Sequence, residues 1–140
     1  MYQSILEHLY VSEISKEDLE GLFIYKGNEV TLTVSPDGEP IQKTLELARK
    51  FLIKLEKYEA KALDRVSKEY LSIYNEDWRN ENEPTLSGAD FLANLKLTHI
   101  WFLSTSNVDF YFSENGMFGN HTIIPQAFDG ENFTHIDMYG

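Results

Sequence analysis

The fold is decided by residues 41–83, which read IQKTLELARKFLIKLEKYEAKALDRVSKEYLSIYNEDWRNENE and contain neither Gly nor Pro. At about 100° per residue, counted from Lys43, the apolar side chains collect between about 100° and 200°. These positions are Ile41, Leu45, Ala48, Leu52, Leu55, Ala62, Leu63, Val66, Tyr70 and Ile73. Since the phase is kept over the whole stretch, the pattern predicts a long amphipathic helix.

The length of this helix predicts that it is not straight. A continuous helix over Ile41 to Tyr74 would be about 51 Å long. A compact domain of this size has a radius of gyration of about 14 Å. Glu59 also falls in the middle of the apolar stripe, where an unpaired carboxylate would be costly to bury. We therefore expect a bend between Glu56 and Lys61, which gives one bent helix or two helices.

The opposite face of the helix carries a basic stripe of Lys43, Lys50, Lys54, Lys57, Lys61, Arg65 and Lys68. Residues 41–75 hold eight of the chain's twelve basic residues and five acidic ones, although the whole chain has a net charge of −11. Glu46 and Asp64 are spaced to pair with Lys50 and Lys68, but Lys neighbours at i,i+4 repel by a few tenths of a kcal/mol. The stripe is either an ordinary solvated face or a candidate interaction surface for acidic groups of this chain, a second copy or a partner.

Strands are expected before the helix. The alternation of Val30, Leu32 and Val34 with Thr residues predicts a half-buried strand, and Leu22–Tyr25 is its expected hairpin partner. Pro36, Asp37 and Gly38 supply the turn that follows. Ile5–Val11 is a candidate for a further strand.

A short helix and four strands are expected after the long helix. Ser87 is spaced to cap the short helix, with Asp90 reaching back, and Trp78 is expected to pack in the core at the end of the long helix. The strands are predicted at Leu97–Leu103, Val108–Ser113, Phe118–Gln126 and Phe133–Tyr139. The sequence thus predicts one α+β domain over residues 1–140, in the order β-β(-β)-α-α-β-β-β-β. A single antiparallel sheet would be covered on one face by the long helix and the short one.

Composition narrows the class of protein. The chain has no cysteine, which excludes disulfides and thiolate chemistry and is compatible with a reducing compartment. No apolar run approaches a membrane span and the start lacks the pattern of a signal peptide, so we expect a cytoplasmic protein. The negative charge disfavours nucleic acid as a partner, and a membrane surface is disfavoured because the apolar face of the long helix is needed for the core. Phosphate-loop, dinucleotide-loop and serine-elbow motifs are missing, and no cofactor is expected.

The four histidines lie far apart in the sequence, without the spacing of a metal site. We expect no metal, and the common role for a strand histidine is structural. The best candidates for a ligand pocket are His121, Asp109, His99 and Trp78. His121 stands out among them, because the nearby Gly119 permits irregular strand geometry of the kind found beside sites.

The layout resembles a bacterial family classed only as a domain of unknown function. The resemblance rests on the hairpin, the long helix that ends in Asn75-Glu76-Asp77-Trp78, and the strand segment Gly119-Asn120-His121-Thr122-Ile123-Ile124. The family pattern reads closer to Gly-His-Ser-Ile, and here Asn120 intervenes. The resemblance implies a bacterial cytoplasmic protein and brings no established activity or catalytic residue. Several small acidic α+β proteins of similar layout are immunity proteins that neutralise toxins, which is an analogy of fold.

The sequence leaves three hypotheses about function. The first is a non-enzymatic interaction module, of the immunity type in its narrowest form, that offers an acidic surface to a basic protein partner. The second is an enzyme or ligand binder with a pocket near His121, Asp109, His99 and Trp78. The third is a homodimeric scaffold in which the basic stripe meets acidic edges of the other copy.

Overall fold

A computed structural model describes all 140 residues and has an α+β fold. One open sheet holds seven strands in the order β1 to β7, so each strand lies beside its neighbours in the sequence. The strands are β1 (Tyr10–Val11), β2 (Leu19–Tyr25), β3 (Asn28–Val34), β4 (Lys96–Phe102), β5 (Val108–Ser113), β6 (Thr122–Ala127) and β7 (Phe133–Tyr139). The helical segments are η1 (Tyr2–Glu7), α1 (Ile41–Ile53), α2 (Leu55–Ile73), η2 (Tyr74–Trp78) and α3 (Gly88–Ala93).

The sheet is mostly antiparallel, but the expectation of an entirely antiparallel sheet is wrong at its centre. β3 and β4 pair in parallel, with Leu32 opposite Ile100. In the sequence, all helices except η1 come between β3 and β4, in the order α1, α2, η2 and α3. A helical crossover of this length returns the chain to the end of the sheet where it started, which is the requirement for parallel pairing.

The first residues also differ from the expectation. Residues 2–7 form the single 3-10 helix η1, and only Tyr10 and Val11 pair with β2. The apolar residues Tyr2, Ile5, Leu6 and Leu9 pack against the main core. Their spacing of three and four residues is helical, which explains why a strand over Ile5–Val11 does not form.

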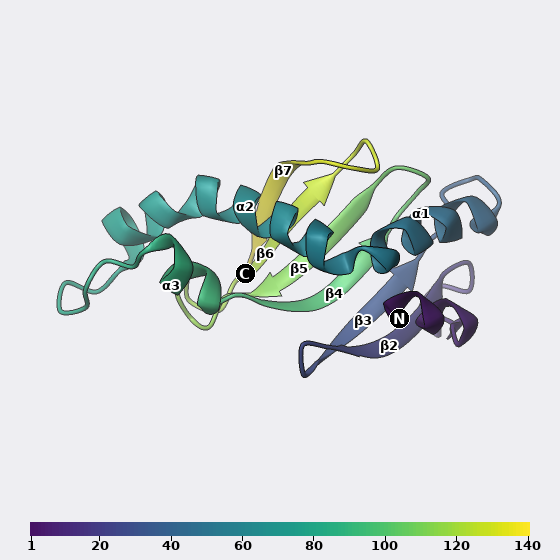
Figure 1. Cartoon of the computed structure of the whole chain (residues 1–140), viewed down its shortest axis with the longest axis horizontal. Helices are drawn as coiled ribbons and strands as arrows, with labels where there is room; N and C mark the ends of the chain where they lie inside the picture. The colour runs from purple at the N-terminus through teal and green to yellow at the C-terminus, as the bar shows by residue number, and fades with distance from the viewer.

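The long helix is interrupted, as expected, but at a different residue. α1 and α2 run one after the other across the sheet (Figure 1), and Lys54 between them has φ −123 and ψ 43. The expected bend between Glu56 and Lys61 is wrong, since α2 continues through Glu59. Phe51 and Tyr58, on either side of the break, stack with ring centroids 3.9 Å apart.

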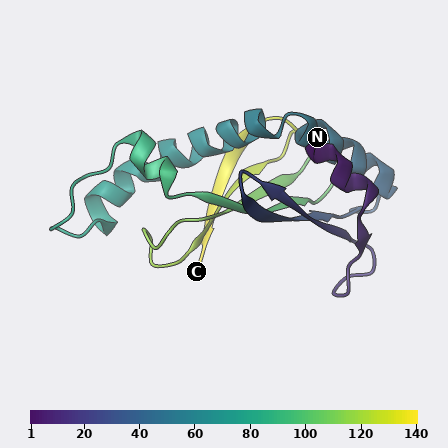
Figure 2. The same ribbon diagram turned by 60° about the horizontal axis from the view of Figure 1, so that its bottom comes forward.

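Buried residues form two clusters. The main core joins α1 and the first half of α2 to β2, β3, β4 and β5 through residues such as Phe51, Leu32 and Phe110. A smaller core joins the end of α2 to η2, α3 and β6 through Tyr74, Phe91 and Phe118. Figure 2 shows the helices along one side of the curled sheet, with α3 at the end far from the N-terminus.

The strand that was expected to begin at Phe118 begins at Thr122. Residues before it form a turn, and the fully buried Phe118 fills the smaller core from that turn. None of the helices combines the length and the apolar character that crossing a membrane requires.

Candidate functional site

The four residues expected to form a ligand pocket lie in two pairs. His99 on β4 and Asp109 on β5 belong to the open face of the sheet, by which we mean the strand side chains that alternate with those of the core. Trp78 and His121 lie together beside the smaller core, with ring centroids 6.1 Å apart. No group of three or more His, Asp or Glu side chains is arranged to hold a metal ion.

The pair on the open face is held by hydrogen bonds and aromatic contacts. His99 Nε2 is 2.8 Å from Thr33 Oγ1, and its ring lies against Trp101 and Tyr111. Asp109 Oδ1 accepts a hydrogen bond of 3.3 Å from the amide of Gln126. Burial lowers the pKa of His99 and raises the pKa of Asp109, because each loses hydration of its charged form. Both shifts favour the neutral side chains.

Trp78 is not the core residue that the sequence predicted, since 45% of it is exposed. Its ring meets Phe118 edge to face, with centroids 5.5 Å apart. Tyr74 already fills the core at the end of the helix, where it is buried beside Phe118. The ring of His121 is held in place by a contact between its Nδ1 and the carbonyl oxygen of Phe118. Trp78 is therefore held in place by its inner edge while its outer part faces solvent.

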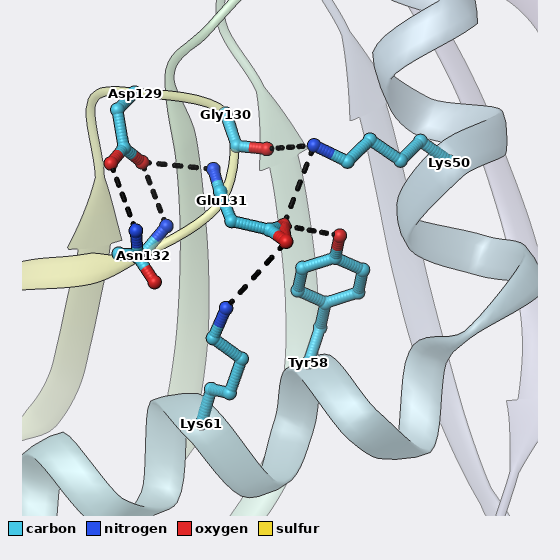
Figure 3. Close-up of polar contacts among 7 residues, drawn as sticks. All are labelled: Lys50, Tyr58, Lys61, Asp129, Gly130, Glu131 and Asn132. Atoms are coloured by element: carbon cyan, nitrogen blue, oxygen red, sulfur yellow. Dashed lines mark hydrogen bonds and ion pairs between the residues drawn. The ribbon is translucent and has the colours of Figure 1, made fainter.

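Part of the basic stripe is paired with an acidic turn of the same chain (Figure 3). The β6–β7 turn reaches the long helix, where Lys50 Nζ donates to the Gly130 carbonyl at 2.7 Å and lies 3.4 Å from Glu131. Lys61 lies 3.9 Å from the same carboxylate, and the hydroxyl of Tyr58 donates to it. The expected Glu46–Lys50 pair does not form, because Lys50 turns to Glu131 instead.

The β6–β7 turn is built to present Glu131. Asp129 Oδ1 accepts hydrogen bonds from the backbone N–H groups of Glu131 and Asn132, at 2.9 and 2.7 Å. The hydrogen bond from Tyr58 lowers the pKa of Glu131, with help from Lys50, and the bonds from Asn132 lower the pKa of Asp129. These contacts fasten the turn to α1 and α2.

The other members of the stripe divide into two groups. Lys43 pairs with Glu39, Arg65 with Glu69 and the predicted Lys68–Asp64 pair forms at 2.9 Å. Lys54 and Lys57 are exposed and form no ion pair. The repulsion along the stripe is therefore offset mainly by acidic groups of this chain.

Glu59, from which the sequence predicted only a bend in the helix, lines a pocket. Glu59 is 7% exposed, and its Oε1 accepts hydrogen bonds from the Tyr25 hydroxyl at 2.9 Å and from Lys26 Nζ at 2.8 Å. Both donors come from the β2–β3 hairpin, more than thirty residues away. Glu59 can stay inside an unbroken helix because the bonds from these two donors offset the cost of burying its charge.

This carboxylate pocket has a volume of about 390 Å³ and is lined by Tyr25, Lys26, Glu59, Asn94, Lys96 and Asn115, among others. Burial, and then the bond to Glu59, raises the pKa of Tyr25 well above its usual range. The hydrogen bond to Glu59 also raises the pKa of Lys26, which outweighs the opposing effect of desolvation. The tyrosine stays protonated and the lysine stays charged at neutral pH.

A second pocket, the tryptophan pocket, has a volume of about 490 Å³ and lies between η2, the loop after it and the 114–119 turn. Trp78, Asn80 and Glu83 line it. Asn94 and Asn115 line both pockets, and a hydrogen bond of 2.8 Å joins their amides. The two pockets are therefore neighbours that meet at this amide bridge.

The amide bridge is placed by two short local structures. Asn94 follows α3, whose first turn is capped by Ser87 Oγ as predicted, with a 3.2 Å bond from Asp90 N. Asn115 has a φ of 54, and the buried carboxylate of Glu114 holds its turn by accepting from the N–H groups of Gly116 and Phe118. Asparagine tolerates this left-handed conformation better than most residues.

Sequence reasoning missed Glu59, Lys26 and the amide bridge as site residues. The signal for Glu59 was present, since it was the one acidic residue inside the apolar stripe. A buried ionisable group that lines a cleft is a candidate for a functional site. Asn94 and Asn115 could not be predicted as site residues, because they belong to no sequence motif.

Fold and pockets define a small α+β protein with an open sheet, a broken long helix and two adjoining polar pockets. The chain belongs to a family described as an uncharacterised protein conserved in bacteria (DUF2262), whose model matches residues 9–138. This confirms the resemblance to an uncharacterised bacterial family. Neither a curated protein nor a solved structure matches the chain.

Proposed function

We propose that this protein is a non-enzymatic interaction module of the bacterial cytoplasm, and that its tryptophan pocket receives a basic segment of a partner protein. The observation that carries the proposal is the exposure of Trp78, which is fixed by Phe118 and His121 and lines a pocket. Tryptophan is enriched among the residues that dominate binding energy at protein interfaces. A half-exposed indole held rigidly can bind a partner with little loss of conformational entropy.

The charge around Trp78 favours a basic partner. Glu76, Asp77, Glu81 and Glu83 are all exposed in η2 and in the loop that follows. Arg79 is the only basic residue among them, and its guanidinium donates to the backbone carbonyls of Asn75, Asn80 and Glu83. It therefore shapes the loop. A lysine or arginine of the partner would meet carboxylates on the rim and the face of the indole inside it.

The narrowest form of the proposal is an immunity protein whose partner is a basic toxin. It is supported by analogy of layout and by the acidic surface. A gene next to this one that encodes a toxin, and whose product binds this chain only when Trp78 is present, would support it. Binding that is unaffected by Trp78→Ala would exclude this use of the pocket.

A fluorescence titration tests the general proposal. The chain has two tryptophans, so Trp101→Phe leaves Trp78 as the only indole, and circular dichroism checks that this variant is folded. The probe is a synthetic peptide rich in Lys and Arg, compared with a peptide of the same length in which Glu replaces them. We expect saturable binding of the basic peptide alone, and we expect the affinity to fall as salt is raised.

Matched charge variants locate the binding surface. Glu83→Gln with Glu81→Gln removes a carboxylate that lines the tryptophan pocket and a second, exposed carboxylate in the same loop, whereas Glu13→Gln with Glu17→Gln removes two exposed carboxylates near the N-terminus. We expect the first pair to weaken binding about tenfold and the second pair to change it little. Equal weakening by both pairs, or failure of the basic peptide to bind, would refute the proposal.

A further inference from the structure

We infer that the carboxylate pocket binds a small molecule that carries both an anionic group and a hydroxyl or ammonium donor. The donor would bind Glu59 and the anionic group would bind Lys96. This inference is independent of the proposed protein partner, because it concerns the pocket on the other side of the amide bridge.

The first step is the unequal use of the two oxygens of Glu59. Oε1 accepts from both Tyr25 and Lys26, while no hydrogen bond from the protein reaches Oε2. Among side-chain nitrogen and oxygen atoms that are inaccessible to solvent, only Thr44 Oγ1 and Arg65 Nε have no hydrogen-bond partner, so Glu59 Oε2 is not an inaccessible atom. Glu59 Oε2 is therefore open to the pocket that its residue lines. The side chain is nine-tenths buried, so its free oxygen offers a strong acceptor in a place of reduced solvation.

The second step is the charge of the pocket. Lys26 and Lys96 are its basic lining residues and Glu59 is its only acidic one. Lys26 is already paired with Glu59 at 2.8 Å, whereas Lys96 forms no ion pair. The pocket therefore has an excess positive charge within a chain whose net charge is −11. An anionic group of the ligand would pair with the free ammonium of Lys96.

The third step is the conformation of Lys26. Its φ is 50 and the φ of Gly27 is 82, so both central residues of the β2–β3 turn are left-handed. Turns of this kind favour Asn-Gly or Asp-Gly, and a lysine there is unusual. The lysine places its ammonium on Glu59, which an asparagine could not do. Strained backbone conformations of this kind tend to occur at ligand sites.

The size and the remaining lining fit a small polar ligand. A volume of about 390 Å³ lies near the lower end of small-molecule sites. Asn28, Asn94, Asn115 and Ser113 supply both donors and acceptors, as hydroxylated ligands require. Glycerate and glycerol phosphate have the predicted chemistry, since each joins an anionic group to hydroxyl groups.

Amide chemical shifts of the full chain, measured by NMR, test the inference with four probes. Glycerate and glycerol phosphate carry both groups, whereas inorganic phosphate carries only the anion and glycerol only the hydroxyls. We expect at least one of the first two to bind at least about tenfold more tightly than phosphate or glycerol. The shifted amides should lie in the β2–β3 turn, in Asn94–Leu97 and around Asn115.

Variants of single residues decide between the inference and simple anion binding. Glu59→Gln and Lys96→Gln should each reduce the affinity for the tighter probe about tenfold, while Lys57→Gln, which is exposed on α2 and outside the pocket, should leave it unchanged. Lys96 is exposed, so its variant serves if Glu59→Gln does not fold. The inference is overturned if no probe shifts these amides, if phosphate alone binds as tightly, or if Lys96→Gln has no effect.

Discussion

The two ends of the long helix lie in two different cores. α1 and the first half of α2 share a cluster of 19 buried residues, whereas the end of α2 shares a cluster of six with η2, α3 and the 114–119 turn. Each cluster contains more than one fully buried phenylalanine, and Phe51 in the larger and Phe118 in the smaller each meet four other aromatic rings. The ring of Phe51 contacts Tyr58, Phe102, Phe110 and Phe133, and the ring of Phe118 contacts Tyr70, Tyr74, Trp78 and Phe91.

The difference between the cores is in what surrounds them. The neighbours of Phe118 include the half-exposed Trp78, and both polar pockets are lined by residues of α3 or of the turn that carries Phe118. Regions with fewer buried contacts open more easily, and binding groups are commonly placed on them over a stable scaffold. We therefore interpret the larger core as the source of stability, and the smaller core as the support of the tryptophan pocket and of the α3 side of the carboxylate pocket.

The largest effect expected from this comparison is that of Phe51→Ala. The ring is fully buried between the helices and the sheet, so its removal leaves a cavity that the surrounding strands cannot fill. We expect a loss of about 3–5 kcal/mol in the free energy of unfolding. Urea denaturation measures it, with the exposed Leu22→Ala as a control that changes stability by less than about 0.5 kcal/mol.

Phe118→Ala should have a smaller effect of about 2–3 kcal/mol, because the turn around it can collapse in part into the cavity. Its consequence should also be local. Amide hydrogen exchange should accelerate in α3 and in the 114–119 turn and change little in β3 and β4. A loss of stability greater than that of Phe51→Ala, or faster exchange throughout the sheet, would contradict the division into two cores.

The same division explains what the sequence could predict. The helix phase, the hairpin and the strands after Lys96 were predictable because each is set by the spacing of apolar residues along a short segment. The parallel β3–β4 pair was not, since it depends on where the crossover of residues 41–95 returns the chain. The bend was predicted at the wrong residues because the sequence of the helix shows no partner for Glu59. The partners of Glu59, Tyr25 and Lys26, lie on the β2–β3 hairpin, which the periodicity of the helix does not reveal.

The pockets were harder to predict than the fold. His99, Asp109, His121 and Trp78 were selected by residue type, and the structure divides them between two places. Trp78 was expected in the core because its sequence neighbours end a helix, but Tyr74 and Phe118 already occupy that space. Lys26, Asn94 and Asn115 come from three loops that are far apart in the sequence, and the spacing of residues along the chain does not indicate that these loops line one pocket.

Tyr58→Phe should have an intermediate effect on the larger core. It removes the hydrogen bond to Glu131 while keeping the ring stacked on Phe51, so we expect a loss of about 1 kcal/mol at neutral pH. The folded-state pKa of Glu131 is below its ordinary value of 4.5, so its contribution is present above that pH and is lost as the pH falls further. Stability measured against pH should therefore fall less steeply in acid for the variant. An unchanged acid slope would show that the Tyr58 bond does not set this pKa.

The smallest expected effect separates two neighbouring lysines of the basic stripe. Lys50 donates to Gly130 and pairs with Glu131, whereas Lys54, four residues on, has neither kind of contact. Since both side chains are largely exposed, Lys50→Gln should cost only about 0.5 kcal/mol. Lys54→Gln should be neutral or stabilising by a few tenths of a kcal/mol, because it removes a like charge near Lys50. Raising the salt concentration should shrink the difference between the two variants. If both variants lost the same stability, the contacts of Lys50 with the β6–β7 turn would not stabilise the fold. Lys50 would then be as available to an acidic partner as Lys54 is, as an interaction surface requires.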